Sequence, residues 1–294
     1  MNAVTPTERA ELSIPDSYLV GLNLDMSADD YHATKAMSAG GLKRMAQSPA
    51  HFYGMQLDPN RPPPGEPSPA LVNGTLVHCA LFEPDQVDAR YVIRPEGMTF
   101  NTKEGKAWKA EQTRIIIDAG QMAAARMQSQ RLRALPELGA LLAEGFGESS
   151  AFWTDEPTGE LCKCRPDWVS PAGDGVILVD GKTCQDASPD GFGRAIWNYS
   201  YHLQAAWYSD GYERATGQKV HGFVFAAVES AWPHQPAAYM LSDEVLGHAR
   251  RENRRLLDLY AECKRTGQWP GYSAAISLIQ LPAWANRQLE NIDD

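Results

Sequence analysis

The order of the predicted elements indicates an α/β fold in which a central mixed β-sheet is flanked by helices. Three observations support this prediction. Apolar residues recur at helical spacing through much of residues 38–142. Short β-rich runs separated by proline- and glycine-containing turns follow over residues 148–182, and a helix and another apolar strand come after them.

The 294-residue chain has the composition of a soluble globular protein, with 43% hydrophobic and 22% charged residues. We expect one main domain over residues 31–270, an N-terminal tail over 1–30 and a C-terminal tail over 271–294. Residues 1–30 lack a secretory signal pattern, and no run of eighteen apolar residues occurs, so we expect a cytoplasmic protein without membrane contact. Five cysteines without a CxxC pair argue against a disulfide framework and a zinc ribbon.

The formal net charge of −10 restricts the ways in which the chain can bind nucleic acid. Proteins that coat nucleic acid by bulk attraction usually carry a basic domain or stripe. Any contact with DNA must therefore be local. Metal ions held by acidic side chains would supply positive charge at the place where phosphate is handled.

Predicted helices dominate the N-terminal half. Residues 38–52 form two short helical turns broken at a Ser-Pro step, since proline suits the first turn of a helix. Six prolines over residues 59–69 predict an extended surface linker within the domain. A mostly apolar helix follows and contains His78, and residues 106–142 form further helices.

The middle of the chain supplies a predicted three-stranded meander, with strands over Glu148–Thr154, Leu161–Val169 and Val176–Lys182. The elements predicted after it are, in order, a helix over Phe192–Thr216, a strand over Val220–Val228, a short strand over Ala237–Leu241 and a helix over Asp243–Thr266. Ser242 is placed to cap this last helix.

Two short charged motifs lie on neighbouring strands of the meander. An Arg-Pro-Asp sequence ends at Asp167, and an Asp-Gly-Lys sequence occupies positions 180–182 after a Pro/Gly turn. Because side chains alternate along a strand, Asp180 and Lys182 project to the same side. Antiparallel pairing of the two strands would bring Asp167 beside Asp180.

This combination of residue types suits metal-dependent phosphate chemistry. Two carboxylates and a carbonyl oxygen are hard ligands that Mg²⁺ or Mn²⁺ prefers, and a neighbouring lysine can orient water or stabilise charge on a phosphate. The alternative is that Asp167 and Asp180 cap turns while Lys182 pairs with one of them. The apolar run over 176–179 that leads directly into Asp180 favours a site, because a buried charge is costly without a partner or metal.

Several further motifs occur in order over about 240 residues. They are Tyr31-His32 followed by SxxxLKRMAQSPAHF, GTLVHCALFEP at 74–84, ESSAFW at 148–153, LCKCRPD at 161–167, DGKT at 180–183 and YHLQAAWYSDGY at 201–212. Through these motifs the chain resembles the PD-(D/E)XK nucleases, and among them the RecE-type exodeoxyribonuclease VIII of prophage origin. Lambda exonuclease and the RecB nuclease domain are relatives of that group.

The resemblance implies a restriction-endonuclease-like core and assigns roles to residues of this chain. Asp167 corresponds to the acidic residue of the PD motif, Asp180 to the first residue of DXK, Gly181 to a carbonyl ligand of the metal and Lys182 to the catalytic lysine. His78 matches a histidine that approaches one metal ion. Without the resemblance, a histidine on an apolar helix would be interpreted as core packing.

The remaining candidates also come from the matched motifs. Glu148 matches a glutamate that opens the first core strand and would be catalytic, with an exposed strand start as the alternative. Gln204 and Tyr208 match a QxxxY pattern, whose members share one helix face and can reach a DNA strand or the active site. Arg165 and Thr183 are candidates for phosphate contact or for support of the carboxylates.

The chain departs from the family in two respects. Gly181 stands where the family usually has an apolar side chain, and a glycine loosens a strand while leaving the carbonyl ligand available. The chain is also shorter than the largest RecE proteins and resembles their nuclease region alone.

By resemblance, the expected activity is 5′ to 3′ exonuclease digestion of linear duplex DNA ends with one or two Mg²⁺ or Mn²⁺ ions. The product would be 3′ single strands for a single-strand annealing recombinase. A ring-like homo-oligomer is also implied, in which basic residues of several subunits line one channel and offset the acidic charge. One alternative is a non-catalytic module that binds DNA ends or a recombinase, against which the intact Asp167, Asp180 and Lys182 argue. A carboxylate-based glycosidase is the other, and a lysine between the acids does not support it.

Overall fold

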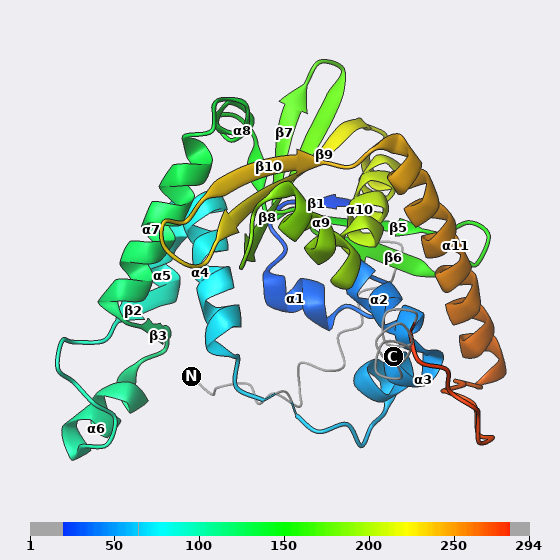
Figure 1. Ribbon diagram of the computed structural model, residues 1–294, viewed down its shortest axis with the longest axis horizontal. Coiled ribbons are helices and arrows are strands. Elements are labelled where there is room, and N and C mark those ends of the chain that lie inside the picture. The colour runs from blue at the N-terminus through cyan, green and yellow to red at the C-terminus, as the bar shows by residue number, and fades with distance from the viewer. Residues whose placement is uncertain (1–19, 64, 283–294) are drawn as a thin grey trace, which may run out of the picture.

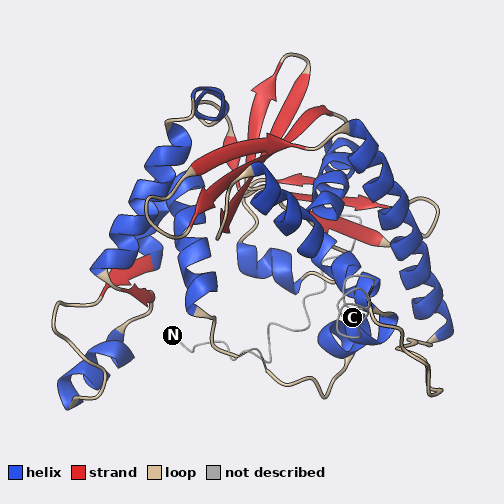
Figure 2. Cartoon of the chain, in the orientation of Figure 1, coloured by secondary structure: helices blue, strands red, loops and turns tan. Residues whose placement is uncertain are grey.

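A computed structural model describes residues 20–63 and 65–282 of the chain. The central sheet contains β4 (Phe146–Gly147), β7 (Trp168–Ala172), β8 (Gly175–Cys184), β9 (Lys219–Glu229) and β10 (Pro236–Met240), in the order β10-β9-β8-β7-β4. Figure 2 shows helices on both sides of the strands. The predicted α/β fold with a mixed sheet flanked by helices is confirmed.

The sheet is mixed because its two longest strands run in parallel. β8 pairs parallel with β9 and antiparallel with β7, while β10 and β4 pair antiparallel with β9 and β7. A parallel pair needs a long crossover connection, which α9 (Pro189–Asn198) and α10 (Tyr201–Thr216) supply. Side chains of Leu178 and Val179 are both fully buried, because helices cover both faces of β8.

The predicted meander divides between two sheets. A second sheet holds β1 (Gly21–Asn23), β5 (Ser150–Thr154) and β6 (Leu161–Cys164), in the order β1-β5-β6. The prediction of one strand over Leu161–Val169 is therefore wrong, because the chain leaves the second sheet after Cys164 and enters the central sheet at Trp168. Pro166 lies in this link and has no N–H to donate to a ladder. Asp167 consequently lies where the two sheets separate.

Two groups of helices enclose the core (Figure 1). On one face of the central sheet, α4 (Pro69–Phe82) and α7 (Ala119–Arg133) pack together around Leu76, Leu132 and Val179. On the other face, α10, α11 (Asp243–Thr266) and α2 (Ala39–Gln47) pack around Leu178 and Leu256. Adjacent residues of β8 thus enter different cores, as the alternation of side chains along a strand requires.

Two predicted helix starts are confirmed by their caps. The Oγ of Ser48 accepts the N–H of His51 at 3.2 Å, so the chain breaks between α2 and α3 (Pro49–Phe52) as predicted. Ser242 caps α11 in the same way, accepting the N–H of Val245 at 3.4 Å. The proline-rich stretch leads into α4, whose first residue is Pro69.

The remaining elements are short. The helical ones are α1 (Ala28–Ala33), a π-helical turn η3 (Tyr53–Leu57), a 3₁₀ turn η4 (Pro84–Gln86), α5 (Val87–Arg90), α6 (Lys103–Glu111) and α8 (Pro136–Leu141). The strands β2 (Tyr91–Ile93) and β3 (Ile115–Ile117) form a separate parallel pair. Among the described residues, no helix has the length and apolar character needed to cross a membrane.

Several predicted elements differ from the structure. The helix predicted over Phe192–Thr216 is broken, because Ser200 adopts a left-handed conformation with φ +53° between α9 and α10. The prediction of helices throughout residues 106–142 is wrong at β3, where three consecutive β-branched isoleucines pair with β2, and no strand was predicted at β2. Residues 21–23 were expected in a tail but form β1, whereas residues 1–19 and 283–294 of the two expected tails lie outside the described part of the chain.

Candidate metal centre and active site

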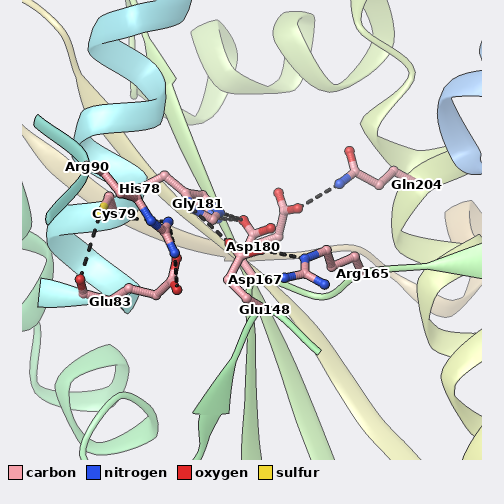
Figure 3. Close-up of polar contacts among 10 residues, drawn as sticks. All are labelled: His78, Cys79, Glu83, Arg90, Glu148, Arg165, Asp167, Asp180, Gly181 and Gln204. Carbon is pink, nitrogen blue, oxygen red and sulfur yellow. Dashed lines mark hydrogen bonds and ion pairs between the residues drawn. The ribbon is translucent and has the colours of Figure 1, made fainter. Parts of the chain in front are cut away.

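Strand pairing brings the two acidic motifs together. Trp168 of β7 faces Val179 of β8, so Asp167 and Asp180 are the next residues along the antiparallel pair. The N–H of Gly181 donates a hydrogen bond to Asp167 Oδ2 at 2.8 Å. The predicted juxtaposition of Asp167 and Asp180 is thus present (Figure 3).

Helix α4 contributes His78 to the same place. Its Nε2 lies 2.8 Å from Asp167 Oδ2, and its Nδ1 lies 3.3 Å from Glu148 Oε1. Ligand atoms of His78, Glu148 and Asp167 all lie within 4.8 Å of one another. Figure 3 shows the imidazole pointing from the helix toward the carboxylates. His78 therefore lies among the carboxylates although it belongs to a mostly apolar helix.

Glu148 does not open a strand as predicted but lies in a kink between β4 and β5. Its φ of +56° is uncommon for a residue with a side chain, and its N–H donates to the carbonyl of Asp167 at 3.2 Å. Such conformations cost about 1–3 kcal/mol and persist only where the surroundings impose them. Here the kink turns the Glu148 carboxylate toward His78.

Arg165 supports Glu148. Only 12% of its side chain is exposed, and its Nε donates to Glu148 Oε2 at 2.8 Å. Its Nη1 also donates to the carbonyl of Met26 at 3.1 Å and to the hydroxyl of Ser150. Of the two roles considered for Arg165, these contacts favour support of the carboxylate over contact with phosphate.

Asp180 and Lys182 form a buried ion pair on the same side of β8. Asp180 is 1% exposed, and its Oδ2 contacts Lys182 Nζ. Gln204 of α10 donates its Nε2 to the other oxygen, Oδ1, at 2.6 Å. Of the two predicted residues on α10, Gln204 therefore reaches the site directly.

The pKa values differ among the three carboxylates, since His78 lowers that of Asp167 whereas those of Asp180 and Glu148 are raised. Burial raises the pKa of Asp180 to about 6, because the attraction of Lys182 is insufficient to compensate for desolvation and for the repulsion of Asp167. Burial also raises the pKa of Glu148, against the opposing effect of His78. Burial alone would lower the pKa of His78, but the charge and hydrogen bond of Asp167 raise it to about 9. A proton on His78 thus supplies positive charge among the carboxylates.

The residues present fit a divalent cation. One imidazole nitrogen and several carboxylate oxygens form a donor set typical of protein metal sites. Asp180 Oδ2 is buried and accepts no hydrogen bond from the described residues, although Lys182 Nζ contacts it. His78, Glu148 and Asp167 can hold an ion, and Asp180 extends the donor set along β8. Coordination by His78 would require loss of its added proton.

Packing explains the glycine at position 181. A Cβ there would lie 2.9 Å from the ring of Phe82 and 3.7 Å from His78 Cδ2. The aromatic side chain of Phe82 on α4 thus occupies the space in which a side chain at 181 would lie. Gly181 allows α4, and with it His78, to approach β8 closely.

Two other predicted residues lie beside the ion pair rather than in it. Thr183 lies next to Gly74 of α4, where a Cβ on the glycine would be 3.4 Å from the threonine hydroxyl, and it lines a small cavity with His78 and Lys182. Tyr208 packs edge-on against Phe223 and belongs to the core behind the site. Burial raises the pKa of Tyr208 well above its usual range.

Lys43 and Tyr201 lie beside the site and were not predicted. Lys43 of α2 points its Nζ to Gln204 Oε1 at 3.5 Å and lies 5.2 Å from the centre of the Tyr201 ring. Lys182 Nζ lies 4.9 Å from the centre of the same ring. Burial and the charge of Lys182 lower the pKa of Lys43 to about 8. Both residues lie in segments that carry the family resemblance, but neither was singled out.

Comparisons with known proteins bear on the fold and the family of the chain. No match was found among curated proteins. A crystal structure of a Eubacterium rectale protein, provisionally described as an exonuclease, has a TM-score of 0.59 at 15% sequence identity and covers 90% of this chain and 98% of its own. A second structure, of SSO0001, has a TM-score of only 0.26 at 12% identity over 38% of this chain and 50% of its own. The first likeness shows a shared fold.

A family model covers most of the chain. The PDDEXK-like domain of unknown function (DUF3799) matches residues 38–282. This range includes every residue of the site described above. The chain therefore belongs to the PDDEXK-like domain family, within the PD-(D/E)XK nuclease superfamily.

Proposed function

We propose that this protein is a metal-dependent deoxyribonuclease that hydrolyses phosphodiester bonds at the site formed by His78, Glu148, Asp167, Asp180 and Lys182. The convergence of His78 from α4, Glu148 and Asp167 from two links between strands, and the Asp180–Lys182 pair from β8 carries this proposal. Buried charges in this number are costly unless a partner or substrate uses them. The family assignment supports the same chemistry.

Lys182 is the residue best placed to stabilise charge on the phosphate. Burial would lower its pKa, but Asp180 and Asp167 raise it above the ordinary value, so its ammonium keeps its proton. It therefore acts as a donor to a phosphate oxygen and not as a general base. A divalent cation bound beside it would add Lewis-acid stabilisation and make a water more acidic.

The other side chains position these groups. Gln204 holds Asp180 Oδ1 and leaves Oδ2 toward Lys182, while Arg165 holds Glu148 Oε2 and leaves Oε1 toward His78. Each carboxylate thus presents one oxygen to the centre of the site. Asp167 is fixed by the N–H of Gly181, which is part of the strand itself.

We further propose the RecE-like form of this activity. In it the enzyme digests linear duplex DNA from 5′ to 3′ with one or two Mg²⁺ or Mn²⁺ ions and leaves 3′ single strands for an annealing recombinase. The ordered motifs over residues 31–212 support this form. A ring-like oligomer, which the resemblance implies, is part of the proposal, and basic residues of several subunits lining one channel would offset the net charge of −10. Light scattering that finds a monomer at working concentration would contradict the ring.

The test uses linear duplex DNA labelled at either the 5′ or the 3′ end, incubated with Mg²⁺, Mn²⁺ or EDTA beside a closed circle. Early loss of the 5′ label from linear DNA only, and only with metal, is the expected result. Early loss of the 3′ label would reverse the polarity but keep the nuclease. Binding of DNA ends without cleavage under any metal would instead support a non-catalytic end-binding module. Asp180→Ala should keep the fold and lose cleavage, and full activity in that variant would overturn the site.

A further inference from the structure

Exposed aromatic rings lie at the junction of α9 and α10. Trp197 is 74% exposed and Tyr199 is 63% exposed, although both are large apolar side chains. A single exposed ring on a protein surface is ordinary. Two of them separated by one residue, on a turn next to a buried charged site, point to a surface that another molecule covers.

The junction holds these rings in a fixed arrangement. Ser200 has a left-handed backbone, and its N–H donates to the carbonyl of Trp197 at 3.1 Å. Trp197 stacks on His202, with ring centres 5.5 Å apart and an interplanar angle of 7°. Tyr199 lies 5.5 Å from the centre of the Tyr201 ring. Ser200, with its strained backbone, thus lies at the turn that holds both ring pairs.

Tyr201 connects the exposed rings to the active site. Ammonium groups of Lys182 and Lys43 lie 4.9 and 5.2 Å from the centre of its ring. The contacts run in sequence from Tyr199 to Tyr201 and then to Lys182. The exposed ring of Tyr199 is therefore linked through Tyr201 to Lys182, the lysine proposed to contact phosphate.

We propose that Tyr199 and Trp197 form a platform on which unpaired bases of the DNA strand stack while its phosphate lies at Lys182. The inference rests on the proposed nuclease function and adds that the strand reaches the site without its partner. Aromatic faces accept any base, but only a base that has left the duplex stack can present its own face.

The charge of the protein makes such stacking important. A chain with a net charge of −10 gains little from attraction of phosphates at a distance. Lys43 and Lys182 supply positive charge only close to the site. Stacking is independent of this charge and typically strengthens binding by about tenfold or more per base. We therefore expect frayed or single-stranded ends to bind more tightly than blunt ends.

The test measures binding without cleavage. A short single-stranded oligonucleotide with 2-aminopurine near its 5′ end, and a blunt duplex of the same sequence, are titrated with protein in Ca²⁺ and again in EDTA. The wild type is expected to bind the single strand more tightly and to quench the 2-aminopurine. The double variant Trp197→Ala/Tyr199→Ala should bind the single strand about tenfold more weakly and lose the quenching, with little change for the duplex.

Two variants serve as controls. Trp197→Phe/Tyr199→Phe keeps both rings and should retain most of the affinity. Tyr272→Ala removes a tyrosine that is 79% exposed but packs on His51 of α3, and it should bind as the wild type does. Thermal unfolding checks that the exposed substitutions leave the fold intact.

Other outcomes would overturn the inference in distinguishable ways. Unchanged single-strand affinity and quenching in the alanine double variant would remove the platform while leaving the nuclease proposal standing. The same result together with a smaller oligomer would assign the rings to contacts between copies of the chain. Failure of the wild type to bind either DNA in either buffer would contradict the nuclease proposal itself, and the platform with it.

Discussion

Asp155 and Asp180 are both almost completely buried, at 0% and 1% exposure, yet their surroundings balance the two charges differently. Arg254 Nη1 lies 2.8 and 2.9 Å from the two oxygens of Asp155, Arg214 lies 3.2 Å from one of them, and Thr158 donates its hydroxyl at 2.7 Å. Burial opposes ionisation of Asp155, but these hydrogen bonds and charges lower its pKa.

The pKa of Asp180 is shifted in the opposite direction to that of Asp155. Lys182 and Gln204 contact it, but burial and the nearby Asp167 still raise its pKa to about 6. The two regions thus contrast a carboxylate whose charge is balanced by two arginines with one whose charge is balanced only in part by the residues around it. Burial alone does not distinguish them, whereas the sign of the pKa shift does.

Substitution of Asp180 should give the largest effect on cleavage. Asp180→Asn keeps the shape of the side chain but removes the charge that pairs with Lys182. We expect linear DNA cleavage to fall on the order of a thousandfold, since several kcal/mol of transition-state stabilisation are lost. Asp155→Asn is the matched control, and its activity per folded molecule should stay near that of the wild type. Similar losses in both variants would remove the distinction between the two regions.

Substitution of Asp155 should instead give the larger loss of stability. Asp155→Asn leaves Arg254 and Arg214 without their buried partner, and we expect the free energy of unfolding to fall by about 2–3 kcal/mol, less than for a fully buried pair because both arginines are partly exposed. Urea denaturation at neutral pH measures this loss.

The loss should also depend on pH. Because the folded-state pKa of Asp155 lies below its ordinary value, its stabilisation is complete above that ordinary value and disappears as the pH falls through the folded-state pKa. The wild type and Asp155→Asn should therefore converge in stability in acid. A constant difference down to low pH would show that packing and not charge is responsible.

The sequence predicts those parts of the site that depend on local geometry. Alternation along one strand places Asp180 and Lys182 together, and a short turn returns Asp167 to them, so both follow from spacing alone. Resemblance was needed for His78 and Gln204, because helices distant in sequence bring them in.

Other features depend on packing that no local pattern reveals. The helix breaks at Ser200, which is neither glycine nor proline. Apolar residues continue at helical spacing across this position, so the sequence pattern gives no sign of the break. The kink at Glu148 arises where the chain passes from one sheet to the other. From the sequence, Lys43 would be interpreted as an ordinary surface lysine. In the structure, α2 packs beside α10 and partly buries Lys43 next to Lys182.

Arg165, which contacts Glu148 of the candidate site, and Arg214, which contacts Asp155, provide a second matched pair. Arg165 orients Glu148, so Arg165→Gln should weaken metal binding by about 10- to 100-fold, as is usual for residues that hold a metal ligand. The Mg²⁺ concentration that gives half-maximal cleavage measures this change. Arg214→Gln removes an arginine from Asp155 instead and should leave the Mg²⁺ dependence unchanged. An equal shift in both variants would point to a general loss of stability.

Lys43 should give the smallest effect, visible in the pH dependence of DNA cleavage. Its pKa of about 8 means that it is charged below that pH and loses its proton above it, while Lys182 keeps its own because its pKa is raised. The kcat/KM of the wild type for linear DNA should therefore fall a few-fold as the pH rises through 8, because one positive charge near the phosphate is lost. Lys43→Arg stays charged and should remove this step.

The ratio of the two pH profiles isolates Lys43, since both proteins contain His78 and any effect of its titration is common to both. Lys43→Met should show reduced activity with no step near pH 8, because it carries no charge at any pH. Parallel profiles for the wild type and Lys43→Arg would mean that the buried lysine does not act on DNA. It would then only fix Gln204, through the contact at 3.5 Å, and a loss in Lys43→Met would reflect the position of Asp180 instead of binding of phosphate.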